Sequence, residues 1–371
     1  MAYDLVVIGG GPAGLSGALR AAKCGLQVAV VERQEKLGGQ LVKQTHKFFG
    51  WAERYAGIRG IEIAKRLVDA VRGEPGIAVF AGTEALGYYP DNALLVEGPS
   101  GVSLISGKTF LFATGAQERM LLFPGNDLPG VYGAGAVQTL MNMHGVRPGR
   151  SVLMVGSGNI GLIVSYQLRQ AGVAVRAIVE ALPQIGGYAV HASKIRRLGV
   201  PILTRHSIKE AHGSECVEGA TIWEVDEGFR GIPGTEKELD VDVICLATGL
   251  TPLGELLWQA GVSMTYVPEL GGFVPVYDEN METDRPGIFV AGDAAGIEEA
   301  STAMLCGEIA GLAAVRRLGK ISPGRFEEER NALARDLLAL RSGPLSAKVR
   351  AGYDRLRALV EGRRSDGSVL R

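Results

Sequence analysis

Length, composition and charge limit what this chain can be. It has 371 residues, of which 46% are apolar, 6% are aromatic and 53 are glycine. This length suits two domains, and so many glycines favour tight turns and close backbone approaches to ligands. The 39 basic and 40 acidic residues nearly cancel, which argues against nucleic acid as a partner.

The cysteines and the apolar runs exclude further classes. Cys24, Cys216, Cys245 and Cys306 are too far apart for a Cys-x-x-Cys pair or for zinc or iron–sulfur ligation, so no metal site is expected. The apolar run at the N-terminus is short and lacks a basic leader, and no later run is long enough to span a membrane. We therefore expect a soluble cytoplasmic protein with buried, reduced cysteines.

A dinucleotide-binding fingerprint occupies residues 3–33, "YDLVVIGGGPAGLSGALRAAKCGLQVAVVER". It reads as strand, glycine turn, helix and strand, and its G-x-G-x-x-G consists of Gly9, Gly11 and Gly14. The helix that begins at Pro12 and Ala13 offers backbone N–H groups to a pyrophosphate. Glu32 and Arg33 end the second strand, where the carboxylate can bind ribose hydroxyls. Together these features predict a nucleotide site.

A second fingerprint occupies residues 150–180, "RSVLMVGSGNIGLIVSYQLRQAGVAVRAIVE". Gly156, Gly158 and Gly161 form the glycine turn, Asn159 and Ile160 start the helix, and Glu180 ends the strand. This internal repeat of a whole strand–helix–strand unit predicts two dinucleotide folds in one chain. The alternative, a second fold that has decayed and binds nothing, remains open.

Three later strands complete the pattern. The segments "KTFLFATGA" (108–116) and "VDVICLATGL" (241–250) both end in Ala-Thr-Gly and would each close a domain; their predicted site residues are Ala113, Thr114, Gly115 and Gly249. The segment "RPGIFVAGDAAG" (285–296) is an apolar strand that ends at Gly292 and Asp293, where a carboxylate could bind ribityl hydroxyls of a flavin. A helix that begins near Glu298, with Glu299 and Ala300 in its first turn, would point N–H groups at the flavin pyrimidine.

This order of motifs resembles the two-dinucleotide-fold flavoproteins, and among them the thioredoxin-reductase-like group. The resemblance covers residues 3 to about 318 and includes "GGGPAG", "GGQL" (38–41), "GSGNIG" and "GIFVAGDAAG". It implies an α/β fold with two Rossmann-like dinucleotide-binding domains. An FAD domain would comprise residues 1–116 and 249–319, an NAD domain residues 117–248, and a helical C-terminal extension residues 320–371. It also implies that Gly39 belongs to the FAD site and that Gln40 and Thr45 lie near the isoalloxazine.

One departure from that group concerns residues 128–140, "LPGVYGAGAVQTL". In thioredoxin reductases a Cys-x-x-Cys follows a Pro-Gly-Val-like turn of this kind, whereas here the run consists of glycine and alanine. Because thiol–disulfide exchange needs a thiolate, a flavin in this chain could not pass electrons to a disulfide at that position.

A closer resemblance lies in "ATGAQERMLLFPGNDLPGVYGAGAVQTL" (113–140) and "ETDRPGIFVAGDAAGIEEASTAM" (282–304). These segments are similar to flavoprotein subunits of opine oxidase, of dye-linked proline and hydroxyproline dehydrogenases, and of hydrogen cyanide synthase. The resemblance implies FAD and NAD as cofactors and, in a homo- or hetero-oligomer, a partner flavoprotein that oxidises an amine or amino acid. Many of these relatives carry a cysteine-rich C-terminal extension for an iron–sulfur cluster, but no cysteine follows Cys306 here.

The last fifty residues read as two helices. One apolar face holds Phe326, Leu333, Leu337 and Leu340, and after Gly343 and Pro344 another holds Leu345, Val349, Leu356 and Val360. These helices could dock on their own domain or could form a docking site for a partner.

The expected function is that of an FAD-dependent oxidoreductase that exchanges hydride with NAD(H) and shares electrons with a partner protein. One alternative is a free-standing NAD(P)H:ferredoxin or quinone reductase, and another is a flavin-binding structural or sensor subunit with an idle second fold. No catalytic residue is identified, because hydride transfer between nicotinamide and flavin is cofactor chemistry. His46 could relay a proton at the flavin edge, and Trp51 and Tyr55 could line the site, but residues of these kinds more often serve a structural or packing role.

Overall fold

The computed structural model describes residues 2–48, 51–343 and 346–365 of the chain. The chain divides into two compact units, one formed by Met1–Gln117 with Thr251–Arg371 and the other by Glu118–Leu250. The first unit therefore contains both ends of the chain. Each unit is described separately below.

The first unit is built on a seven-stranded sheet with the order β3-β2-β1-β6-β5-β4, in which β19 also pairs with β6. The strands β1, β2, β3 and β19 run parallel to the second half of β6, and β4 and β5 extend the sheet as an antiparallel hairpin. Continuous apolar runs such as residues 5–8 suit strands that are buried on both faces. The strand bounds are β1 (Ala2–Ile8), β2 (Val28–Glu32), β3 (Ile77–Ala81), β4 (Glu84–Tyr89), β5 (Ala93–Gly98), β6 (Gly101–Phe112) and β19 (Ile288–Val290).

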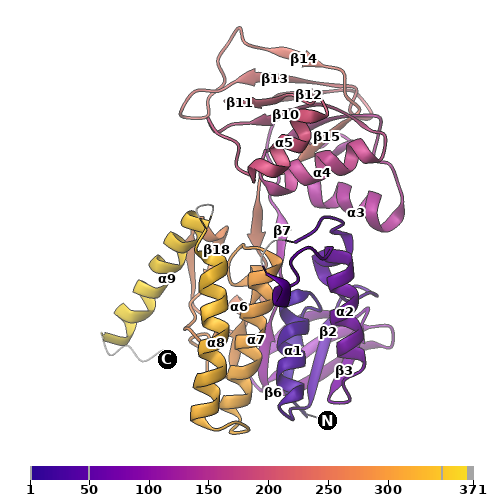
Figure 1. Ribbon diagram of the computed structural model, residues 1–371. Helices are drawn as coiled ribbons and strands as arrows, with labels where there is room; N and C mark the ends of the chain where they lie inside the picture. The colour runs from indigo at the N-terminus through magenta and orange to yellow at the C-terminus, as the bar shows by residue number, and fades with distance from the viewer. Residues whose placement is uncertain (1, 49–50, 344–345, 366–371) are drawn as a thin grey trace. The chain divides into compact units, whose positions relative to one another are not determined.

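The helices of the first unit come from both ends of the chain. In Figure 1, α7 lies beside α1 and α8 lies beside α7. The α1–α7 approach needs glycine, because a Cβ on Gly307 or Gly311 would overlap the backbone of α1. The bounds are α1 (Pro12–Lys23), α2 (Gly60–Arg72), α6 (Glu255–Gln259), α7 (Ala300–Arg317), α8 (Pro323–Arg341), α9 (Ala347–Ser365), the 3-10 helices η1 (Gly39–Lys43), η2 (Ala52–Arg54), η3 (Pro268–Leu270) and η4 (Gly292–Ala294), and the strand pair β17 (Met264–Val267) and β18 (Gly272–Pro275).

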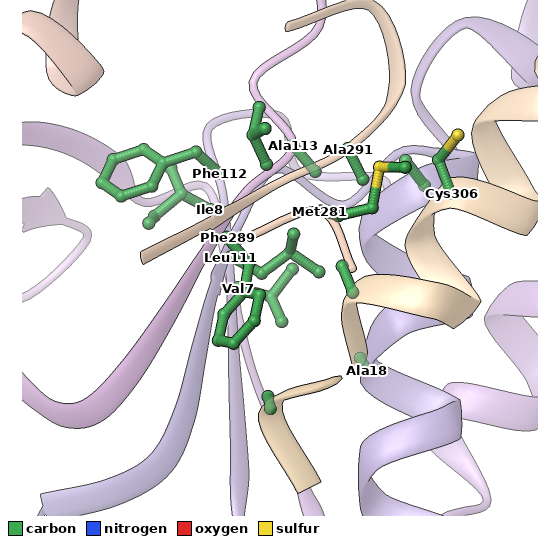
Figure 2. Packing of buried hydrophobic residues seen from close by; sticks show 14 of the residues in the cluster. Val7, Ile8, Ala18, Leu111, Phe112, Ala113, Met281, Phe289, Ala291 and Cys306 are labelled. Atoms are coloured by element: carbon green, nitrogen blue, oxygen red, sulfur yellow. The ribbon is translucent and has the colours of Figure 1, made fainter. Parts of the chain in front are cut away.

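The core of the first unit joins early and late segments of the chain. Figure 2 shows Val7 of β1, Leu111 of β6 and Phe289 of β19 packed together. Met281, which precedes β19, and Cys306, which belongs to α7, lie to one side of them in this view. The three strand residues are fully buried, and burying each such side chain contributes about 1.5–3 kcal/mol. The first unit is therefore a discontinuous domain whose two sequence segments share one core.

The second unit is built on a five-stranded parallel sheet with the order β11-β10-β9-β15-β8. Alternate residues of β9 point to opposite faces: Val152 and Met154 pack in one buried cluster and Leu153 and Val155 in another. Residues of α3, α4 and α5 complete the first cluster, and the antiparallel strands β12 and β13 contribute to the second. The bounds are β8 (Val131–Gly133), β9 (Ser151–Val155), β10 (Ala174–Glu180), β11 (Ile202–Thr204), β12 (His206–His212), β13 (Gly219–Glu224), β14 (Lys237–Leu239), β15 (Val243–Leu246), α3 (Ala134–His144), α4 (Asn159–Gln170) and α5 (Ala189–Arg197).

The chain passes between the units twice, through the short strands β7 (Ala116–Glu118) and β16 (Leu250–Pro252). These two strands pair with each other as a two-stranded ribbon. Next to the ribbon, the N–H of Arg119 donates to the carbonyl oxygen of Gly249 at 2.9 Å, and the N–H of Leu253 donates to that of Gly115 at 3.0 Å. The two passages are therefore adjacent in space although they are far apart in the sequence.

The C-terminal helices pack on the first unit. Phe326, Leu333 and Leu337 of α8 are buried in its core, as the predicted apolar face requires, and Leu356 of α9 is 2% exposed. Ser322 caps the start of α8 by accepting a hydrogen bond from the N–H of Arg325. Pro344 and Leu345, which belong to the predicted pattern, lie outside the described residues. Within those residues no helix combines the length and apolarity that a bilayer span requires.

Candidate functional site

The two glycine fingerprints have the same local geometry. Gly9 and Gly156 open the turns with φ of +107° and +105°, a region that L side chains rarely adopt. A Cβ on either would overlap a carbonyl oxygen at the end of the neighbouring strand, and a Cβ on Gly14 or Gly161 would overlap the carbonyl oxygen of Gly9 or Gly156. The first and third glycines are thus required by the turn and by the packing of the helix on it.

The middle glycines differ from the other four because protein packing does not require them. A Cβ on Gly11 would meet only the Cα of Gly39, at 3.8 Å, and no described atom lies within 4 Å of a Cβ placed on Gly158. Each is the N-cap of its helix, α1 or α4, and neither cap has a side-chain hydrogen bond from a described residue. Both helices therefore present N–H groups and a positive dipole end beside open space, which fits a phosphate.

An acidic residue braces each turn. Glu32 is buried; its Oε2 accepts from the N–H of Gly10 at 2.7 Å and its Oε1 from that of Gln34 at 2.8 Å. The Oε2 of Glu180 accepts from the N–H of Ser157 at 3.0 Å and from its Oγ at 2.6 Å. Because a carboxylate has about four acceptor positions, each acid can brace its turn and still accept a ribose hydroxyl.

A further repeated element was missed in the sequence. The segments "ERQEKLGG" (32–39) and "EALPQIGG" (180–187) both run from the bracing acid to a glycine pair. The N–H of Gly38 donates to the carbonyl oxygen of Gly10 at 2.8 Å, and the N–H of Gly187 donates to that of Ser157 at 2.9 Å. Each unit thus folds the segment after its bracing acid back onto its glycine turn, through the first glycine of the pair in one unit and the second in the other. Aligning the two repeats beyond their acids would have revealed the shared glycine pair.

The segment after β19 reaches the start of α1. A Cβ on Gly292 would lie 2.9 Å from the Cβ of Ala13, which follows Pro12 in the first turn of α1. Asp293 comes next, and its Oδ1 accepts from the N–H of Glu298 at 3.3 Å. Burial raises the pKa of the Asp293 carboxyl to about 6. Gly11, Glu32, Gly39 and Asp293 are therefore parts of one neighbourhood in the first unit.

Helix α7 begins at Ala300 with Glu299 as its N-cap, close to the start predicted from the sequence. No side chain of a described residue makes a cap hydrogen bond there. Thus α7, like α1 and α4, starts with backbone donors that its own cap residue does not satisfy.

The remaining predicted residues have mixed settings. Ala113 is buried at the end of β6, and the Oγ1 of Thr114 donates to the carbonyl oxygen of Leu253 at 2.7 Å. Gly115 and Gly249 have φ of +78° and +116°. The settings of the other predicted residues are as follows: Arg33, Gln40 and Ile160 are exposed, Asn159 accepts from the N–H of Tyr188 at 2.8 Å, and the carbonyl oxygen of Thr45 accepts from the Nη1 of Arg59 at 3.0 Å. Their roles in cofactor binding remain predictions.

The glycine–alanine run surrounds a carboxylate. The Oε1 of Glu118 accepts from the N–H of Gly135 at 2.6 Å, and its Oε2 accepts from that of Ala136 at 3.1 Å. A Cβ on Gly133 would overlap this carboxylate. The small residues thus leave room for an acid that caps the start of α3. Sequence reasoning missed Glu118, because it precedes the run by a whole loop.

The expectation of buried cysteines holds for Cys245 and Cys306 but is wrong for Cys216, which is exposed, while Cys24 is half-buried. All four lie in described segments and all are free thiols. Cys245 is fully buried in β15, and burial, with a smaller contribution from the charge of Glu118, raises its thiol pKa. Burial also raises the pKa of Cys306 to about 11. Both thiols are therefore protonated near neutral pH and poorly nucleophilic. Within the described residues, no group of three or more histidine, cysteine or acidic side chains could hold a metal ion.

Curated relatives of this chain are subunits of opine oxidase, of sarcosine oxidase and of hydrogen cyanide synthase. The chain is 28% identical over 335 residues to one of the subunits of opine oxidase from Agrobacterium tumefaciens, a match that covers 86% of this chain and 67% of that protein. It is 25% identical to hydrogen cyanide synthase subunit HcnB of Pseudomonas protegens, over 92% of this chain and 76% of that protein. It is 30% identical to the alpha subunit of sarcosine oxidase from Rhizobium meliloti, of which it spans only 31%.

Solved structures share the fold. L-proline dehydrogenase from P. horikoshii matches with a TM-score of 0.66 at 25% identity, over 90% of this chain and 59% of that one. Thioredoxin reductase from T. acidophilum matches with a TM-score of 0.70 at 22% identity, over 86% of this chain and 99% of that one. These matches and the two parallel sheets confirm the predicted α/β fold with two Rossmann-like folds.

The family assignment rests on most of the chain. The sequence profile of the pyridine nucleotide-disulphide oxidoreductases matches residues 3–307, which include both fingerprints and the segment after β19. The predicted resemblance is thereby confirmed at the level of the family, whose members bind FAD and NAD(P). With its paired glycine turns, bracing acids and family-wide match, the chain belongs to the pyridine nucleotide-disulphide oxidoreductase enzymes.

Proposed function

We propose that this enzyme binds FAD in its first unit and NAD(H) in its second, transfers hydride between them, and exchanges electrons with a partner flavoprotein without a redox disulfide. The observation that carries the proposal is the pair of middle glycines, Gly11 and Gly158. Protein packing does not require their lack of a side chain, but a pyrophosphate would. Because both turns keep this feature, the second fold is proposed to be occupied and not decayed.

The residues that would hold FAD lie in one neighbourhood. Backbone N–H groups at Gly11 and Ala13 would bind the pyrophosphate, and Glu32 would accept the adenosine ribose hydroxyls. Asp293 would bind the ribityl hydroxyls, and the start of α7 would bind the flavin pyrimidine. Bound FAD would supply a two-electron centre that the side chains themselves lack.

The second unit offers the matching site for NAD(H). The start of α4 at Asn159 would bind the pyrophosphate and Glu180 the adenosine ribose. The acid at Glu180 favours an unphosphorylated ribose, because a 2′-phosphate would bring like charges together.

A direct exchange with a partner protein is favoured by the place of Glu118. The start of α3, where the resemblance places a dithiol in thioredoxin reductases, is taken up by a carboxylate and the glycines around it.

Relatives of this chain are named as subunits of opine oxidase and hydrogen cyanide synthase, which supports a multisubunit role in amine or amino-acid oxidation. The first unit also exposes three contacting aromatic side chains, Trp258, Tyr266 and Phe273, of a kind common in protein interfaces.

The test has two parts. The purified full chain should contain about one FAD per chain, and NADH should bleach it under anaerobic conditions. Affinity purification of the chain from its native source should then recover a flavoprotein that oxidises an amine or amino acid. A chain that lacks flavin, or whose flavin neither nicotinamide reduces, would contradict the enzymatic part. A native protein that elutes alone and reduces ferredoxin or quinone rapidly would replace the partner with the free-standing reductase.

A further inference from the structure

The segment Ala291–Glu299 joins β19 to α7 and carries the residues proposed to contact the flavin. Its only regular structure is the short η4, and both Gly292 and Gly296 have positive φ, +69° and +151°. Such a segment has little intrinsic conformational preference. Its shape must therefore be set by the groups that pack on it.

The body of the first unit holds one side of this segment. The N–H of Ile297 donates to the carbonyl oxygen of Leu270 at 3.0 Å, and the hydroxyl of Tyr277 donates to the carbonyl oxygen of Ala295 at 3.3 Å. Leu270 is fully buried and Tyr277 nearly so. These contacts position the backbone but leave the side chain of Glu298 to other partners.

The C-terminal helices hold the other side through Glu298. The Nε of Arg341, the last residue of α8, donates to Oε1 of Glu298 at 3.0 Å and its Nη2 to Oε2 at 2.5 Å. The hydroxyl of Tyr353 in α9 donates to the same Oε2 at 3.0 Å. The guanidinium carbon of Arg341 also lies 3.9 Å from the ring centroid of Tyr353. Two tail helices thus converge on one carboxylate.

This contact is shielded from water. The side chains of Arg341 and Glu298 are only 15% and 9% exposed. An ion pair buried to this degree tolerates loss of one partner poorly, because the other charge is left desolvated. The N–H of the same Glu298 donates to Asp293, and Asp293, Glu298 and Tyr353 line one small cavity. A shift of Glu298 would therefore be felt at Asp293.

Other ion pairs already fix α8 to the unit. Arg20 of α1 bonds Glu329 at 2.5 Å, and Arg54 of η2 bonds Asp336 at 2.7 Å. Neither pair includes a residue of the segment Ala291–Glu299. The Arg341–Glu298 pair is thus the one of these three whose loss would act on the segment directly.

We propose that Arg341 and Tyr353 are positioning residues of the flavin site: by clamping Glu298 they hold the Ala291–Glu299 segment in its binding conformation. The proposal rests on the proposed function, since it takes this segment to contact the flavin. It assigns the C-terminal helices a role in the affinity of the first unit for its cofactor.

The experiment compares Arg341→Met with Arg20→Met in the full chain. Both changes remove the arginine of an ion pair that ties α8 to the rest of the first unit. Only Arg341→Met removes a partner of Glu298. Two quantities are measured on flavin-free protein: the dissociation constant for added FAD, and hydrogen exchange of backbone amides in residues 291–299. Tyr353→Phe, which removes one hydroxyl, serves if Arg341→Met does not fold, and Arg341→Lys tests rescue by a remaining positive charge.

Arg341→Met should weaken FAD binding at least about tenfold and speed exchange in residues 291–299. Tyr353→Phe should change both in the same direction by less, and Arg341→Lys should recover part of the loss. Arg20→Met should leave both within about twofold of the unmodified chain. Unchanged affinity and exchange in Arg341→Met, or an equal loss in Arg20→Met, would overturn the proposal. If the unmodified chain binds no FAD, the proposed function fails instead, and the exchange comparison still decides whether the clamp orders the segment.

Discussion

At the scale of single residues, Gly11 and Gly158 differ from the other four fingerprint glycines because a Cβ on either would meet no atom of the described residues closer than 3.8 Å. We expect Gly11→Leu to abolish flavin retention with little change in the thermal stability of the flavin-free protein, since the new side chain would enter the pyrophosphate path. Gly14→Ala is the matched control; its Cβ overlaps the carbonyl oxygen of Gly9, so it should lower the free energy of unfolding by about 1–3 kcal/mol. Flavin content and thermal unfolding measure the two effects. A Gly11→Leu protein with full flavin content would refute the assignment of the site.

Glu180 should select NADH over NADPH. A 2′-phosphate about 4 Å from this carboxylate would cost on the order of 1–4 kcal/mol, depending on the effective dielectric constant. Glu180 braces Ser157 and the N–H of Leu182, so Glu180→Gln is a gentler change than Glu180→Ala. We expect faster anaerobic flavin reduction by NADH than by NADPH, and a smaller ratio in Glu180→Gln. Equal rates with the unmodified chain would count against this role.

Asp293 should make stability depend on pH in the flavin-free protein. Burial raises its folded-state pKa to about 6, above the unfolded value of about 3.9. The Asp293 carboxyl therefore makes its full contribution to the free energy of unfolding below about pH 4, and this contribution is lost as the pH rises through 6. Relative to Asp293→Asn, the unmodified chain should lose up to about 3 kcal/mol of unfolding free energy by pH 7. Denaturant titrations from pH 4 to 8 cover most of this change, and a pH-independent difference would show that the pKa of Asp293 is not raised.

At the scale of elements, the start of α3 depends on Glu118. Glu118→Ala should lower the free energy of unfolding by about 0.5–2 kcal/mol, because it removes the acceptor for the N–H groups of Gly135 and Ala136. Gly133→Ala should destabilise the unmodified chain, since its Cβ would overlap the carboxylate, but should cost little when Glu118 is already alanine. Denaturant unfolding of the two single variants and the double variant gives this coupling. Additive losses of unfolding free energy would show that the carboxylate of Glu118 is not what excludes a side chain at Gly133.

How far an element could be predicted from the sequence depends on the range of its contacts. The fingerprint turns of Gly9 to Gly14 and Gly156 to Gly161 were predictable because strand, turn and helix adjoin in the chain. The apolar period of α8 likewise predicted Phe326, Leu333 and Leu337 as its buried face.

Elements joined by distant contacts could not be predicted in this way. The carboxylate of Glu118 reaches α3 across an intervening loop, and Arg341 meets Glu298 from 43 residues further along the chain. A charged residue in a helix reads as solvent-exposed by pattern alone. Only the folded structure shows which acid it faces.

At the scale of the whole molecule, the absence of a dithiol relay can be tested by replacing all four cysteines. Cys245 and Cys306 are buried with raised thiol pKa values, so substitution by alanine should cost stability but not chemistry. We expect the cysteine-free chain to keep NADH-to-dye electron transfer within about twofold of the unmodified rate, with a lower Tm. The loss in Tm on replacing only Cys24 and Cys216 should be smaller, because these two are less buried. If the cysteine-free chain loses turnover while it remains folded, a cysteine takes part in electron transfer and the proposed direct exchange is wrong.

The paired passages of the chain at β7 and β16 have a consequence for the history of such a gene. Because both ends of Glu118–Leu250 arrive at one ribbon, the segment is a cassette that could be lost, gained or exchanged while leaving the host domain with ends already adjacent. Deleting it and joining Gln117 to Thr251 through a short loop should yield a folded protein that retains the proposed flavin site and loses the proposed nicotinamide site, as FAD content and NADH binding would measure. Exchanging this segment between relatives should then change the proposed nucleotide preference while the first unit stays unaltered.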